Sequence, residues 1–245
     1  MKVLSKNSLC FKGKNPKLLA ADKALRVMNA HYPAASSTRY RKFNVAQNNS
    51  KLQQDIGFSI GTKCAYLRNH LMQIEQTETP LDFIKEFLDI VENWRLSNCF
   101  ELVKMFNFIM DLNGIETRWA SLLPSEIDHC VALIPLNEDT FEKTDFTQKP
   151  MSKMKDVLVA DPWLGVVDYA PNIATMYKHH PDFNRCIGSP EDYENWELFV
   201  PKFRLEDYYL RPDEYHYKKL TVEDKKSLAK TNPELFFDKN ELIKH

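Results

Sequence analysis

Apolar residues crowd one central stretch of the chain, residues 100–112, more densely than any stripe on a surface helix would require. They occupy every face of a predicted helix, which is typical of a helix buried inside a domain. Asn113 and Gly114 follow as a left-handed helix stop, and the β-branched and aromatic residues from Ile115 to Leu123 then predict a strand. The apolar positions of the helix are Phe100, Val103, Met105, Phe106, Phe108, Ile109, Met110 and Leu112.

The start of this helix carries a cysteine. Asn98 is a suitable N-cap, and Glu101 three residues later completes a capping-box pattern. Cys99 is then expected at the first helical position, where its sulfur faces the positive end of the helix dipole. A thiol reacts as its thiolate, and such a position lowers the thiol pKa.

Two further apolar segments each bring one polar side chain to a strand end. His129 opens the segment HCVALI, and Asp161 closes the segment VLVAD just before Pro162. An imidazole can activate a thiol, and a carboxylate can fix the imidazole tautomer and support its charge. The sequence therefore predicts a catalytic triad of Cys99, His129 and Asp161.

Other roles for these residues stay open at this level. A cysteine in an apolar helix is often a small core residue, and an aspartate before proline often forms a turn. Asp168, in a further expected strand over 166–169, is a weaker candidate for the acid because it follows the break at Pro162. Cys130 adjoins His129 but should point to the opposite face of the strand, which disfavours it as the nucleophile.

In order and spacing, the segment from Trp94 to Tyr169 resembles the core of the transglutaminase-like branch of the papain-like cysteine enzyme superfamily. A cysteine opens a helix, Gly114-Ile115 and Arg118 follow, and the histidine and aspartate come at two later strand ends. The resemblance implies an α+β fold, with helices packed on an antiparallel sheet, and it implies nucleophile, base and orienting acid roles for the three residues. The chain departs from that pattern at Ser97, where the family commonly has glycine, and at Val131, where it commonly has an aromatic residue.

Composition narrows the functional classes. A 245-residue chain with 43% hydrophobic residues can bury a substantial core, and a net charge of −1 gives no general case for nucleic-acid binding. We expect no membrane-spanning segment and no Sec-type signal. Five scattered cysteines without paired zinc spacing indicate a reducing compartment, and His179-His180 with Cys186 make a poor metal site. We expect no cofactor and no metal.

The expected organisation has three parts. Residues 1–50 form an N-terminal arm and connector, with a short helix over 20–31; residues 51–220 form the catalytic domain; and residues 221–245 form a helical tail. Within the domain we expect helices over 63–74 and after the Thr79-Pro80 cap, and an exposed insertion over 135–156. Trp94 should take a core position or line the approach to the thiol.

These features favour a cysteine-dependent acyl-transfer enzyme acting on protein amides, as a transglutaminase, deamidase or protease. One alternative is an inactive protein-binding domain of the same fold, with the 135–156 loop or the aromatic segment 193–217 as the binding surface. Another is an acyltransferase that uses a small thioester donor. The expected partner is a protein substrate, with a host protein as one candidate, because the charged tail resembles secretion signals of effectors that bacteria inject into host cells. Localisation is then cytoplasmic, or in a host cytosol without a Sec signal.

Overall fold

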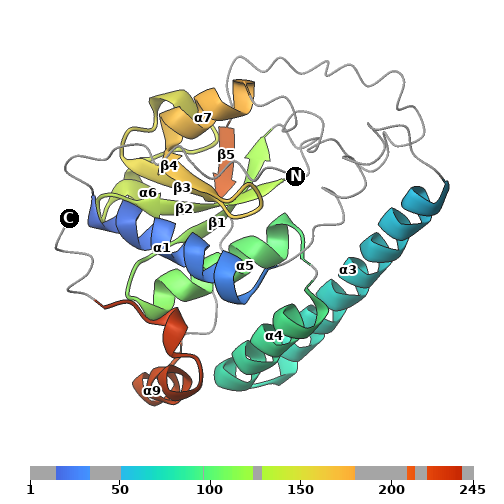
Figure 1. Cartoon of the computed structure of the whole chain (residues 1–245). Helices are drawn as coiled ribbons and strands as arrows, with labels where there is room; N and C mark the ends of the chain where they lie inside the picture. The colour runs from blue at the N-terminus through green and yellow to red at the C-terminus, as the bar shows by residue number, and fades with distance from the viewer. Residues whose placement is uncertain are drawn as a thin grey trace.

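The computed structural model describes residues 15–33, 51–95, 97–123, 129–179, 209–212 and 220–238 (Figure 1). Its helices are α1 (Pro16–His31), α3 (Lys51–Thr77), α4 (Pro80–Trp94), α5 (Cys99–Leu112), α6 (Thr140–Lys143), α7 (Ala170–His179) and α9 (Val222–Thr231), with short 3-10 helices η1 (Met151–Lys153) and η3 (Pro233–Leu235). Its strands are β1 (Arg118–Leu123), β2 (Cys130–Pro135), β3 (Val157–Asp161), β4 (Val166–Tyr169) and β5 (Tyr209–Pro212). The expected mixture of helices and an antiparallel sheet is confirmed.

The five strands form one sheet in the order β4-β3-β2-β1-β5, with every neighbouring pair antiparallel. Strands β2 and β3 are buried along their whole length, which explains why both read as continuous apolar runs. Because the strands are antiparallel, the start of β2 lies beside the end of β3. His129 and Asp161 occupy those two neighbouring ends.

Helices cover both faces of the sheet (Figure 1). Cys130, Ala132 and Ile134 face one layer, where they pack with α1 and α5. Val131 and Leu133 face the other layer, which contains α7 and the segment between β2 and β3. The side chains of β2 thus alternate between the two cores, as a strand period of two requires.

The segment between β2 and β3 is not the exposed insertion that its polar sequence predicted. It contains α6 and η1, and four of its apolar side chains are buried against the second face of the sheet: Phe141, Phe146, Met151 and Met154. The spacing of these four side chains matches neither a helix period nor a strand period. The prediction of an exposed segment therefore rested on the charged residues between them.

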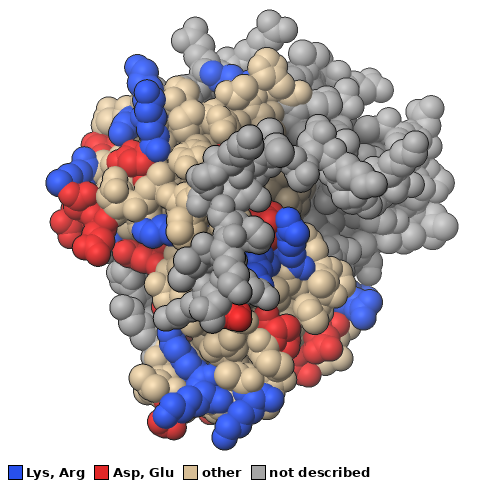
Figure 2. All heavy atoms as spheres, turned by 60° about the vertical axis from the view of Figure 1, so that its left-hand side comes forward, with Lys and Arg blue, Asp and Glu red and all other residues tan. Residues whose placement is uncertain are grey.

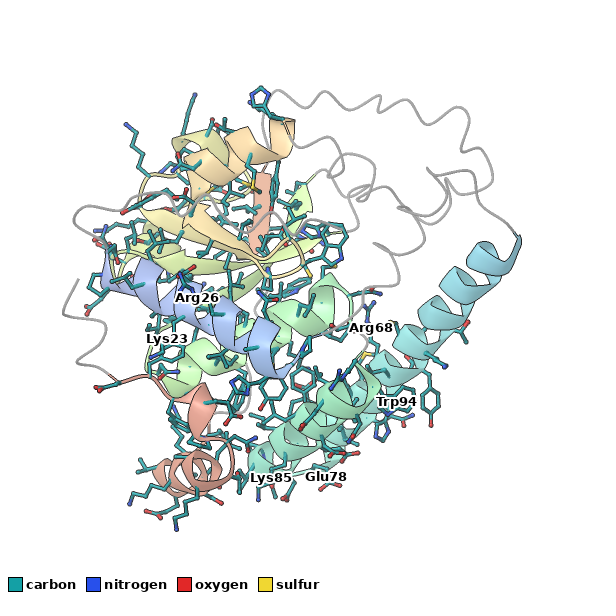
Figure 3. All side chains as sticks on the ribbon, viewed as in Figure 1. Lys23, Arg26, Arg68, Glu78, Lys85 and Trp94 are labelled. Atoms are coloured by element: carbon teal, nitrogen blue, oxygen red, sulfur yellow. The ribbon has the colours of Figure 1, made fainter. Side chains whose placement is uncertain are left out.

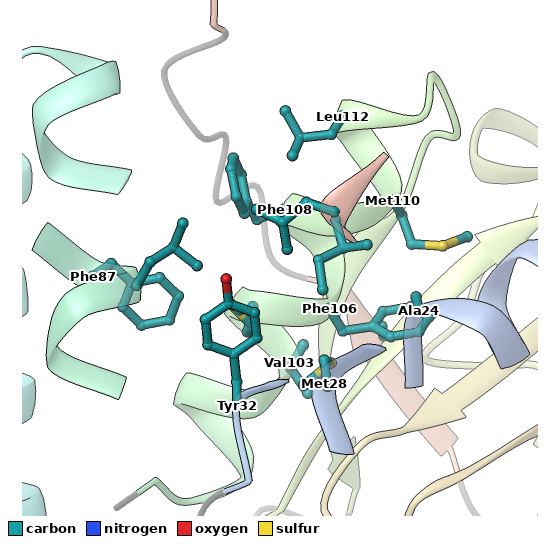
Figure 4. Packing of buried hydrophobic residues seen from close by; sticks show 14 of the residues in the cluster. Ala24, Met28, Tyr32, Phe87, Val103, Phe106, Phe108, Met110 and Leu112 are labelled. Carbon is teal, nitrogen blue, oxygen red and sulfur yellow. The ribbon is translucent and has the colours of Figure 1, made fainter. Parts of the chain in front are cut away.

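Helix α5 is the centre of the larger core, as Figure 4 shows for Phe106, Phe108 and their neighbours. Its predicted start is confirmed, because Cys99 is its first residue and the Glu101 carboxylate accepts the Asn98 N–H at 2.9 Å. Its predicted stop is confirmed too. The N–H of Ile115 donates to Met110 at 3.0 Å, and the N–H of Gly114, which has a φ of +75°, donates to Asp111 at 2.9 Å.

Two ion pairs join α5 to α3, which runs as one helix from residue 51 instead of only over 63–74. Arg68 Nε lies 2.7 Å from the buried Glu101 carboxylate, and Lys104 Nζ lies 2.6 Å from Glu75. Figure 3 shows Arg68 reaching from α3 toward the first turn of α5. The same carboxylate that caps α5 is therefore held by a second helix.

Both ends of the expected catalytic domain need correction. Helix α1, assigned to an arm, packs on α5 and β4 with six buried residues, including Ala20, Ala21 and Ala24, whose small side chains allow close approach. At the other end, Leu228 and Leu235 of the expected tail are buried in the same core. The Asn113 side chain fixes this segment, since it donates to the Leu235 carbonyl and accepts the Phe237 N–H.

The molecular surface carries mixed charge. On the face drawn in Figure 2, acidic and basic side chains lie interspersed over the described residues. Trp94 lies at the surface at the end of α4, where it is 43% exposed and stacks on Tyr66 of α3. The expected core position is therefore wrong, and the ring contacts Tyr66 instead of lining the approach to the thiol.

We predict that Gly114→Ala lowers the free energy of unfolding by about 1 kcal/mol, because a left-handed backbone strains any residue with a Cβ. No atom lies within 4 Å of the added Cβ, so backbone strain is the only expected contribution. Urea unfolding measures the loss. Gly114→Asn should lose less, since asparagine tolerates this conformation; equal stability of all three proteins would contradict the argument.

Candidate active site

Cys99, His129 and Asp161 lie on three neighbouring elements. Cys99 is the first residue of α5, His129 directly precedes β2, and Asp161 is the last residue of β3. Helix α5 packs on β2, and β2 pairs with β3 through Ala132 and Ala160. The packing of α5 on β2 and the pairing of β2 with β3 therefore bring the three residues together. The first and the last of them, Cys99 and Asp161, are 62 positions apart in the sequence.

The histidine and the aspartate form a buried pair. His129 Nε2 lies 2.8 Å from Asp161 Oδ2, and the two side chains are 3% and 0% exposed. The edge of the Trp163 ring, 5.5 Å away between centroids, packs against the imidazole. Since Nε2 is engaged by the carboxylate, Nδ1 is the nitrogen left for the cysteine.

The Asp161 carboxylate has two further donors. Tyr177 of α7 donates its hydroxyl to Oδ2 at 2.8 Å, and the Leu164 N–H donates to Oδ1 at 3.0 Å. Tyr177 is fully buried. These donors fix the orientation of the carboxylate toward His129. Sequence reasoning missed Tyr177, because a tyrosine in an apolar helix looks like an ordinary core residue.

The imidazole is held in its charged form. Burial by itself would lower the pKa of His129, but attraction to Asp161 and hydrogen bonds to Asp161 and to the Cys99 sulfur raise that pKa to about 10. An imidazolium is therefore present at neutral pH, and it lies beside the thiol.

The thiol of Cys99 is correspondingly acidic. Hydrogen bonds from Cys130 and from His129, together with the charge of His129, outweigh burial and lower the Cys99 pKa to about 5. Of the described cysteines, Cys64 and Cys130 are buried, and Cys99 is partly exposed. The result is a thiolate-imidazolium pair at the start of a helix, in a residue that is partly exposed as a whole.

Cys130 is the second group that sequence reasoning missed. It faces the α5 layer, as strand alternation predicted, but that layer contains Cys99. Its side chain hydrogen-bonds the Cys99 sulfur, and its own pKa is raised by burial and by that contact. The site extends around the end of β2, so residues on opposite faces of the strand both touch the same sulfur.

An indole adjoins this pair. Trp119 of β1 packs edge-on against Phe100, the residue after Cys99, and lies close enough to Cys130 to lower the pKa of its thiol. Within the described part of the chain, its buried Nε1 has no hydrogen-bond partner apart from the Cys130 thiol, and the buried hydroxyl of Ser97 has none. A buried donor without a partner is costly unless a ligand or reaction intermediate uses it.

The rival acid lies outside this arrangement. Asp168 pairs with Val159 across β3 and β4, and its carboxylate accepts the Tyr169 N–H. The described ranges contain no group of three or more His, Cys, Asp or Glu side chains arranged to hold a metal. His180, Cys186 and most of the aromatic segment 193–217 fall outside the described residues.

Comparison with known proteins found no matching family model, no matching curated protein and no matching solved structure. None of the helices in the described ranges is long and apolar enough to cross a membrane.

We predict that iodoacetamide alkylates Cys99 with an apparent pKa of about 5. The pKa is lowered, so the thiolate persists as pH falls until about 5, and labelling should be rapid at pH 6, where an ordinary thiol is protonated. Mass spectrometry of labelled peptides measures the rate at each cysteine. In His129→Ala the apparent pKa should rise toward its ordinary value; uniform slow labelling of all cysteines at pH 6 would contradict the arrangement.

We predict that Tyr177→Phe lowers the free energy of unfolding by about 2 kcal/mol and slows Cys99 alkylation at pH 6, because a buried carboxylate loses one donor and orients His129 less well. Urea unfolding and labelling kinetics measure the two effects. Tyr66→Phe is the matched control, because Tyr66 is 64% exposed on α3. Equal losses in the two variants would show that the Tyr177 hydroxyl has no special role.

Proposed function

We propose that the chain is a cysteine-dependent acyl-transfer enzyme that uses Cys99 as nucleophile, His129 as acid and base, and Asp161 as the orienting carboxylate. The observation that carries this proposal is that Cys99 opens α5 beside a buried imidazole whose Nε2 lies 2.8 Å from the Asp161 carboxylate. The contact with His129 helps to lower the pKa of the Cys99 thiol. Structural cysteines have no need of such an arrangement, because a neutral buried thiol is stable alone.

The arrangement supports the following first half-reaction. The Cys99 thiolate attacks the carbonyl carbon of an amide, and the carbonyl oxygen becomes negatively charged. The first N–H groups of α5 have no carbonyl within the helix to bond, so they can stabilise this oxyanion. His129 then gives its Nδ1 proton to the leaving amine, and a thioester remains on Cys99.

The second half-reaction resolves the thioester. Neutral His129 takes a proton from water or from an incoming amine, which attacks the acyl carbon and releases Cys99. Water gives proteolysis or deamidation, and an amine gives a crosslink. The Asp161 carboxylate, which is held by His129, Leu164 and Tyr177, keeps the imidazole oriented through both half-reactions.

The substrate class comes from the sequence resemblance to transglutaminase-like enzymes. A cysteine at the start of a buried helix, with a histidine and an aspartate at adjacent ends of antiparallel strands, supports a papain/transglutaminase-like core and a protein amide as substrate. The described cysteines Cys64, Cys99 and Cys130 are all free, in keeping with action in a reducing cytosol.

Quantitative mass spectrometry of a cell lysate treated with the wild-type chain or with Cys99→Ser tests the proposal. We predict new peptide termini, deamidated glutamines or isopeptide crosslinks with the wild type alone. His129→Ala should lower their rate by roughly 100-fold or more, because it removes the general acid and base.

Glu116→Gln serves as a control, since Glu116 is exposed and lies outside the triad. Rapid alkylation of Cys99 without any of these products would restrict the proposal to acyl donors other than protein amides. Incubation with a small thioester would then give an acyl adduct on the chain, which intact-mass analysis would detect. Slow alkylation with no product would favour a protein-binding domain without catalysis.

A further inference from the structure

Cys130 takes no part in the acyl-transfer steps, yet its thiol contacts the proposed nucleophile. Its side chain hydrogen-bonds the Cys99 sulfur, and its backbone N–H points at the same atom. Both residues open rigid elements, α5 and β2, that pack together in the larger core. A second thiol in contact with a thiolate is the arrangement from which disulfides form.

We propose that Cys99 and Cys130 form a peroxide-responsive pair, in which a hydroperoxide oxidises Cys99 and Cys130 converts the product into a reversible disulfide. The pair stands on the packing of α5 on β2, which brings both cysteines into the same core cluster, and on the contact between their side chains. It is independent of acyl transfer. Only its consequence, loss of activity, rests on the proposed function, because the disulfide consumes the proposed nucleophile.

The chemistry balances in two steps. The Cys99 thiolate attacks one oxygen of hydrogen peroxide, the O–O bond breaks, and the leaving hydroxide takes a proton from the His129 imidazolium to form water. Cys99 is now a sulfenic acid. The Cys130 sulfur attacks the Cys99 sulfur, the S–O bond breaks, and the Cys130 proton passes by way of His129 to the departing hydroxide. Two thiols and one peroxide thus give one disulfide and two waters.

The two thiols have the different protonation states that these steps need. Cys99 is the thiolate that reacts with peroxide, whereas burial and the neighbouring thiolate raise the pKa of Cys130 and keep it protonated until Cys99 has lost its charge. Cys99 is also the partly exposed member, so peroxide reaches it first. Cys130 is only 4% exposed.

The remaining described thiol gives a matched control. Cys64 belongs to α3 and is as buried as Cys130 is, with 2% exposure. Cys64→Ser should leave peroxide chemistry at Cys99 unchanged, whereas Cys130→Ser should divert the sulfenic acid to sulfinic and sulfonic acids, because no thiol remains beside it.

The experiment treats the full chain with hydrogen peroxide at pH 7, quenches with an alkylating agent, and analyses non-reduced peptides by mass spectrometry. We expect a Cys99–Cys130 crosslinked peptide in the wild type and in Cys64→Ser, and its loss after incubation with a dithiol reductant. Cys130→Ser should instead accumulate sulfinic acid at Cys99. Cys130→Ala, with its fold checked by thermal unfolding, should repeat that result if serine disturbs the site.

Alkylation before and after reduction separates this proposal from the proposed function. Peroxide should abolish Cys99 labelling in the wild type, and reductant should restore it, whether or not any acyl substrate is found. Equal sulfinic acid at Cys99 in the wild type and in Cys130→Ser, with no crosslinked peptide, would overturn the pair while leaving acyl transfer intact.

Discussion

The fully buried Asp161 carboxylate is the constraint on which the rest of the site depends. A polar group buried this completely is costly unless hydrogen-bond partners surround it, and here an imidazole, a phenol hydroxyl and a backbone N–H all point at it. These partners come from the start of β2, from α7 and from the turn after β3. The carboxylate therefore joins these three segments, and it orients His129, which in turn contacts the Cys99 sulfur.

The sulfur is positioned by a helix that cannot easily move. Helix α5 is apolar on nearly every face, and its buried charged groups are paired: Glu101 caps the helix and bonds Arg68, and Lys104 bonds Glu75. Removing either partner of such a pair would leave a buried charge alone, which costs more than the pair itself contributes. The first turn of α5 is thus fixed both by its own cap and by α3, and the thiolate keeps a constant position relative to His129.

The two thiols of the site differ in pKa because their surroundings differ. Cys99 lies at a helix start and beside an imidazolium, whereas Cys130 lies on the inner face of a strand beside an indole. Their contact stabilises the negative sulfur and makes the neutral one less acidic. The hydrogen bond between the two thiols thus helps to lower the pKa of Cys99. The same contact places Cys130 beside the Cys99 sulfur as a potential disulfide partner.

The sequence by itself determined the local elements and the identity of the three polar residues. Hydrophobic period, capping residues and helix stops are encoded within a few positions, so the start and end of α5 and the strands β2, β3 and β4 could all be predicted. Only the tertiary structure decided that α1 and the C-terminal segment complete the core, that four apolar side chains anchor the 135–156 segment, and that Tyr177, Trp119 and Cys130 adjoin the triad. Those contacts join residues far apart in the chain, and their strength depends on which faces of separate elements meet, which no local pattern records.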